Sequence, residues 1–105
     1  MLYKIKSIRY SGSKSTIRGY ERTDGRYPKR VGRIVADIPL EKSCVGKPLV
    51  LQYVKDENGN DYSGYYLNCS LIVGIHNVFN KIVCIETINS IYEFERIESE
   101  VEQCK

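Results

Sequence analysis

The sequence has few of the residues on which catalysis and membrane insertion usually depend. Its 105 residues include no tryptophan, one methionine and one histidine, His76. Any acid–base scheme would therefore have to use His76 alone. Apolar runs such as residues 71–73 are far shorter than the roughly 20 residues of a membrane-spanning helix. The N-terminal residues alternate lysine with apolar side chains and lack the apolar stretch of a secretory signal, so we expect a cytoplasmic protein without a membrane span.

The cysteines also lack the spacing of a metal or redox site. No pair among Cys44, Cys69, Cys84 and Cys104 has the CxxC spacing of a zinc knuckle or a redox dithiol. Cys69 and Cys84 lie in apolar segments, where a cysteine in a reducing compartment behaves as a small buried hydrophobe. We therefore expect no metal site, no cofactor and no disulfide.

Catalytic motifs are missing as well. Residues 11–16, SGSKST, have small residues and a lysine, but a Walker A loop needs a glycine directly before the lysine, and Lys14 follows Ser13. A nucleophile, base and acid could be drawn from a cysteine, His76 and Glu86, but the cysteines are expected in the core. We assign no catalytic residue and predict a protein that is not an enzyme; an enzyme with an unrecognised site remains an alternative.

What the sequence does contain is a series of strand-like segments. Alternating or β-branched apolar residues occur at residues 2–10, 31–38, 48–54, 64–73, 75–78, 81–87 and 90–97. Asn58-Gly59 favours a reversal between two antiparallel strands. We predict a single, mainly β domain: a small antiparallel sheet or SH3-like barrel of five to seven strands with a long basic N-terminal loop. Its parts are a basic segment 1–33, a meander body 34–97 and an acidic tail 98–105.

The alternation also predicts the core. Tyr92 and Phe94 alternate with Glu93 and Glu95, so the aromatic pair should face inward and the carboxylates outward. The same reasoning along the other segments predicts a core of Ile34, Val35, Leu49, Leu51, Leu71, Val73, Ile82, Cys84, Tyr92 and Phe94.

Charge is divided unevenly along the chain. Residues 1–33 carry ten basic side chains against two acidic ones, whereas residues 34–105 carry six basic against eleven acidic. Such a separation creates a positive face that attracts anions. The alternative is that the acidic remainder folds against the basic part, or pairs with it in a second copy. Opposite charges and open sheet edges together predict a homo-oligomer.

The basic segment also interleaves aromatic and basic residues. A tyrosine ring can stack on a base while neighbouring cations bind phosphate oxygens. Loops as long as residues 11–30 are usually functional or disordered. We therefore predict a ligand-binding surface of Tyr10, Lys14, Arg18, Tyr20, Arg22, Arg26, Tyr27, Lys29 and Arg30. We also expect its arginines to serve binding rather than folding; the alternative is that the tyrosines cover the barrel rim and the arginines are merely solvated.

The closing hairpin carries a resemblance. Its pattern T-x-N-S-x-Y, formed by Thr87, Asn89, Ser90 and Tyr92, resembles the last hairpin of small uncharacterised β-proteins of bacteria and their phages. Through Phe79, Asn89 and its arginines, the chain is also similar to Thoeris anti-defence proteins, which sequester nucleotide messengers. This likeness implies a phage-encoded or mobile-element protein that acts in the host cytoplasm, and it adds Phe79 and Asn89 to the ligand-binding residues.

Three functions remain open from the sequence. The first is a non-enzymatic binding protein that captures an anionic, nucleotide-type ligand. The second is an anti-CRISPR-like inhibitor that binds a host defence or nucleic-acid enzyme. The third is a single-stranded nucleic-acid binding module.

Overall fold

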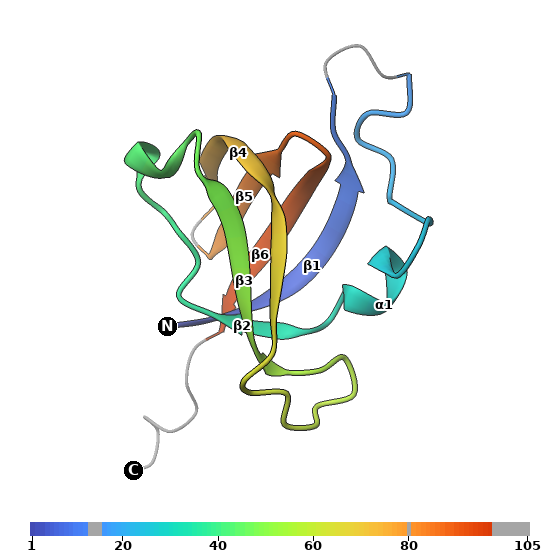
Figure 1. The fold of residues 1–105 in the computed structure, drawn as a ribbon, viewed down its shortest axis with the longest axis vertical. Coiled ribbons are helices and arrows are strands. Elements are labelled where there is room, and N and C mark those ends of the chain that lie inside the picture. Colours follow the sequence, from blue (N-terminus) through green and yellow to red (C-terminus); the bar gives the residue numbers. More distant parts are fainter. Residues whose placement is uncertain (13–15, 80, 98–105) are drawn as a thin grey trace.

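Six antiparallel strands close into a barrel in the computed structural model, which describes residues 1–12, 16–79 and 81–97 (Figure 1). The strands follow one another around the barrel in sequence order: β1 (Leu2–Tyr10), β2 (Ile34–Ala36), β3 (Pro48–Lys55), β4 (Tyr66–Phe79), β5 (Ile82–Thr87) and β6 (Ser90–Ile97). A short helix α1 (Tyr27–Arg30) precedes β2, and a 3-10 turn η1 (Lys42–Cys44) precedes β3. The prediction of a small, mainly β barrel is confirmed.

Strand β1 closes the barrel by pairing with both β2 and β6. Tyr3 lies opposite Val35 on one side and Arg96 on the other. Tyr3, Ile5 and Ile8 are buried in the core. The first ten residues of the basic segment are therefore part of the barrel wall rather than of a loop attached to it.

The core includes half of the residues predicted for it. Val35, Leu49, Leu51, Tyr92 and Phe94 are buried, and Tyr92 stacks on Phe94 with ring centroids 5.9 Å apart. The other predicted core residues are half-buried or exposed: Ile34, Leu71, Val73, Ile82 and Cys84.

In β4 and β5, the predicted inward and outward positions are interchanged. Ile72 and Val83 are buried, whereas the predicted Leu71 and Val73 are 42% and 50% exposed. Continuous apolar runs do not show which alternate set faces inward, whereas the glutamates of β6 do. A bulge between Ile72 and Gly74 also shifts the register of β4 against β5.

Strand β4 joins two segments that we predicted as separate strands. Its first half pairs with β3 up to Leu71, and its second half pairs with β5 from Ile72 onward. In these pairings, residues 66–70 have a strand neighbour on one edge, the one that faces β3. Their other edge is free to border a cleft.

The turn between β3 and β4 forms where predicted. The Asp56 carboxylate accepts hydrogen bonds from the backbone N–H groups of Asn58 and Asn60, both at 2.9 Å. Gly59 has φ +86°, a conformation that a side chain would disfavour.

The reversed facing of β4 can be tested with two neighbouring leucine-size side chains. Ile72→Ala should lower the free energy of unfolding by about 2–5 kcal/mol, because it leaves a cavity in the core. Leu71→Ala should lower it by less than about 1 kcal/mol, because this side chain is exposed. Urea denaturation of both variants measures the difference. Equal losses would contradict the facing described here.

Candidate ligand-binding cleft

The basic loop after β1 folds back along the edge of that strand. The Gly19 N–H donates to the Tyr10 carbonyl, and the Tyr10 N–H donates to the Tyr20 carbonyl, both at 2.9 Å. The Arg22 N–H donates to the Ile8 carbonyl, also at 2.9 Å. Gly19 reverses the chain with φ +88°. The loop therefore directs α1 toward the open edge of β4.

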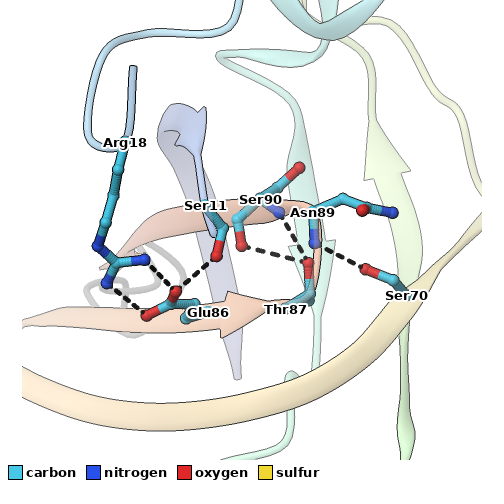
Figure 2. A network of polar contacts seen from close by, with 7 residues as sticks. All are labelled: Ser11, Arg18, Ser70, Glu86, Thr87, Asn89 and Ser90. Carbon is cyan, nitrogen blue, oxygen red and sulfur yellow. Dashed lines mark hydrogen bonds and ion pairs between the residues drawn. The ribbon is translucent and has the colours of Figure 1, made fainter. Parts of the chain in front are cut away.

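Arg18 is bound to a carboxylate on β5. Its guanidinium donates to both oxygens of Glu86, at 3.0 Å for Nη2 to Oε1, and the Ser11 hydroxyl donates to the same carboxylate (Figure 2). These hydrogen bonds, with that of Arg18 the strongest influence, hold the pKa of Glu86 below its ordinary value. The positive charge of Arg18 is therefore compensated within the protein.

Arg22 joins the loop to the hairpin between β5 and β6. Its Nη1 donates to the Asn89 carbonyl at 3.0 Å and to the Ser90 hydroxyl at 2.8 Å. Its Nε and Nη2 donate to the Asp24 carboxylate at 3.0 and 2.6 Å. The guanidinium carbon also lies 3.8 Å from the centroid of the Tyr27 ring, and the side chain is 12% exposed. Arg22 is a structural clamp whose charge is already paired.

The T-x-N-S-x-Y hairpin is held by its own side chains. The Thr87 hydroxyl accepts from the Ser90 N–H at 3.0 Å and donates to the Ser90 carbonyl at 3.2 Å (Figure 2). The Asn89 N–H donates to the Ser70 hydroxyl at 3.3 Å, which ties the hairpin to β4. The Tyr92 hydroxyl lies 3.4 Å from the Cys69 sulfur. The side-chain amide of Asn89 has no hydrogen-bond partner among the described residues and remains available to a ligand.

A cleft of about 220 Å³ lies where these parts meet. Its walls come from α1, from the first half of β4 and from the β5–β6 hairpin, through Tyr27, Arg30, Leu67, Asn68, Cys69, Ser70, Thr87, Asn89, Ser90 and Tyr92. Burial raises the pKa values of the Cys69 thiol and the Tyr92 phenol, so both are neutral at pH 7. These two groups form an uncharged part of the cleft lining.

Arg30 supplies the positive charge of the cleft. Its guanidinium carbon lies 4.8 Å from the centroid of the Tyr27 ring, and it has no ion-pair partner within the described residues. Asn68 and Asn89 are exposed, so their amides can donate and accept hydrogen bonds at the cleft mouth. A free guanidinium, two amides and an aromatic ring in one hollow can bind an oxyanion together with a planar polar group.

The structure separates the predicted site residues into groups. Three of them, Tyr27, Arg30 and Asn89, line the cleft, although Asn89 is 59 positions from Arg30 in the chain. Arg22 lies over the rings of Tyr10 and Tyr27 as part of the clamp. The remaining described residues of the set lie outside the cleft: Arg18, Tyr20, Arg26 and Lys29.

For two predicted binding residues, the structure gives no side-chain position. Lys14 and the side chain of Phe79 lie outside the described residues. The backbone of Phe79 ends β4 opposite Ile82, at the far end of β5 from Asn89. Sequence reasoning missed Asn68 and Ser70, although polar residues at alternate positions of an apolar strand indicate a wet face there.

Within residues 1–12, 16–79 and 81–97, no three histidine, cysteine, aspartate or glutamate side chains gather to hold a metal ion. In the same part of the chain, no helix is long and apolar enough to cross a bilayer.

The clamp role of Arg22 changes the expectation that the arginines of this segment serve binding alone. Arg22→Ala should lower the free energy of unfolding by about 1.5–3 kcal/mol, because hydrogen bonds made by a charged group are lost at a mostly buried site. Arg26→Ala is the matched control, since Arg26 is exposed and should change stability by less than about 0.5 kcal/mol. Thermal and urea denaturation compare the two; similar stabilities would argue against the clamp.

Acid should weaken the contacts of the loop. Arg18 lowers the pKa of Glu86, and Arg22 lowers that of Asp24 to about 2. A lowered pKa means that the ionised carboxylate stabilises the folded state above its unfolded pKa, and that this stability is lost as the pH falls through the folded pKa. The melting temperature should therefore fall from about pH 5 toward pH 2. Glu86→Gln should show a smaller fall than the native chain, and an identical pH profile would contradict the role of the carboxylate.

The chain was also compared with known proteins. No protein family, curated protein or solved structure matches the chain.

Proposed function

We propose that the chain is a non-enzymatic binding protein that captures an anionic, nucleotide-type ligand in the cleft. One observation carries the proposal: Arg30, whose charge has no acid partner among the described residues, lies beside the ring of Tyr27 and shares the hollow with the free amide of Asn89. A guanidinium binds phosphate oxygens through paired hydrogen bonds. An amide can bind the polar edge of a base, and a tyrosine ring can cover its face.

The distribution of paired and unpaired charges supports this position for the ligand. Arg18, Arg22 and Arg33 are bound to Glu86, Asp24 and Glu57. The cations of α1 and its N-terminal flank have no ion-pair partner among the described residues: Arg26, Lys29 and Arg30. Three unpaired cations of the basic segment are therefore gathered at α1 and its flank, next to the cleft, where they attract anions.

The size of the cleft limits the part of a ligand that it can hold. At about 220 Å³ it is smaller than the roughly 300–1,000 Å³ of pockets that enclose drug-sized molecules. It suits one nucleotide unit or part of one. A protein that sequesters such a ligand in a host cell would bind it without converting it.

A second candidate function, contact with a protein partner, is favoured by an exposed apolar patch. Leu71, Val73 and Ile88 are each more than two-fifths exposed, and the Ile88 N–H donates to the Leu71 carbonyl at 3.0 Å. Such patches often mark protein contacts. The predicted homo-oligomer would use a surface of this kind, since barrel closure weakens the argument from open sheet edges and leaves the short free edge of β4 at residues 66–70. Light scattering tests this role of the patch by comparing the molar mass of the native chain with that of Leu71→Ser and Val73→Ser, which should be lower if the patch joins two copies.

Substitution of Arg30 tests the proposed function. In calorimetric titrations with nucleoside monophosphates, Arg30→Ala should weaken binding by about 10- to 150-fold, the value of one or two charge-assisted hydrogen bonds. Lys42→Ala removes an exposed cation from η1, on the other side of the barrel, and should bind as the native chain does (Figure 1). Unchanged binding in Arg30→Ala, or a loss of equal size in both variants, would contradict the proposal.

A further inference from the structure

A second group of aromatic side chains lies on the hairpin between β3 and β4. The rings of Tyr62 and Tyr65 stack with centroids 4.8 Å apart and an interplanar angle of 21°. The ring of Tyr53 lies 5.1 Å from that of Tyr62. Together with Tyr66 these residues form what we call the tyrosine cluster: Tyr53, Tyr62, Tyr65 and Tyr66. The cleft residues include none of them.

The cluster has exposed rings that rest on more buried neighbours. Tyr65 and Tyr66 are each 62% exposed, although one face of Tyr65 is covered by Tyr62. Arg33 lies against the inner rings, with its guanidinium carbon 5.0 Å from the Tyr53 centroid and 5.1 Å from that of Tyr62. Glu57 accepts from the Arg33 Nε at 2.8 Å. These contacts order Tyr53, Tyr62 and Tyr65 before any ligand arrives, which lowers the entropic cost of binding.

A hollow of about 250 Å³ opens at the exposed rings. It is lined by Gln52, Tyr53, Gly64, Tyr65 and Tyr66. Gly64 has no atom within 4 Å of the position that a Cβ would take, so a flat ligand can approach the backbone there. An aromatic hollow of this kind accepts the face of a planar ring.

Consecutive residues of β4 line the hollow and the cleft. Tyr66 belongs to the first, and the next residue, Leu67, belongs to the second. Tyr66 and Ser70, at the two ends of this run, are about 13 Å apart at the usual rise of a strand, which is too far for one base to contact both. A ligand that fills both hollows must therefore contain more than one ring.

The chain at the end of α1 connects the cleft to the tyrosine cluster. Arg30, the last residue of α1, lines the cleft. Arg33, three residues later, has its guanidinium over the rings of Tyr53 and Tyr62. Figure 1 shows α1 beside the lower part of the barrel, where the β3–β4 hairpin begins. Gly32, two residues after α1, lies against Glu57 of that hairpin.

We propose that the tyrosine cluster is a second base-stacking site and that the ligand is a single-stranded oligonucleotide, which spans both hollows with a phosphate at Arg30. This inference rests on the proposed function of the cleft. Alternating aromatic rings and cations along one surface are how proteins bind single strands, because every base has a face to stack and every nucleotide a phosphate. Arg26 and Lys29, which have no ion-pair partner among the described residues, would lie along the strand's phosphates.

A length series of oligothymidylates tests the inference. Binding of the full chain to thymidine monophosphate and to oligomers of two to six nucleotides would be measured by calorimetry at fixed salt. Affinity should rise with length beyond one nucleotide. Tyr65→Ala should weaken binding of the hexamer by about 5- to 150-fold, the usual range for one stacked base, while binding of the monophosphate stays unchanged.

Two variants serve as controls for this experiment. Tyr65→Phe keeps the ring and should keep the affinity for the hexamer. Tyr20→Ala removes a tyrosine that is 65% exposed and lines neither hollow, and it should bind as the native chain does. The melting temperature of each variant shows whether it is folded, and exposed positions make folding defects small.

The outcomes separate the two proposals. If the monophosphate binds as tightly as the hexamer and both depend on Arg30, the inference is overturned and the proposed function stands. A hexamer affinity that Tyr65→Ala leaves unchanged also overturns it, as does equally tight binding of an oligoglutamate of matched charge, which would indicate an acidic peptide. If no nucleotide of any length binds, both proposals fail.

Discussion

Strand β4 divides its backbone pairing between two neighbours, and the other features of the surface depend on this division. Its first half pairs with β3 and its second half pairs with β5. The first half therefore has no strand on the edge that faces away from β3. The free edge at residues 67–70 is where α1 packs its tyrosine and arginine and where the cleft forms. A straight β4 that paired with β5 along its whole length would leave no room for either.

The arginines of the basic segment then have two different roles. Arg18 and Arg22 connect the loop to the β5–β6 hairpin, and their partners neutralise them. Arg30 sits on the same loop but faces the free edge of β4, where no acid lies among the described residues. The alternative of internal compensation thus applies to some cations of the segment, whereas others have no acid partner among the described residues.

The sequence predicted the barrel class and most strand positions because alternation and turn residues are local signals. It predicted the facing of β6 correctly because Glu93 and Glu95 mark the outer positions. In β5, Glu86 marks the face of Cys84 as the outer one in the same way, but the prediction did not use it, and the apolar run around Leu71 carries no charged residue. For the cleft, the sequence indicated the types of residue involved but not which residues come together. Its assembly depends on register, and the pairing of Arg18 with Glu86 joins residues 68 positions apart, which no local pattern reveals.

The cleft walls belong to three elements that meet only when the barrel is closed. Neither α1 nor the β5–β6 hairpin would hold the cleft geometry in a partly unfolded chain, so a ligand that needs all three walls binds the native state alone. Mass action then stabilises the whole barrel in proportion to ligand concentration. An occupied chain would resist proteases and hydrogen exchange as one cooperative unit, and it would lose its cargo in the same step in which it unfolds.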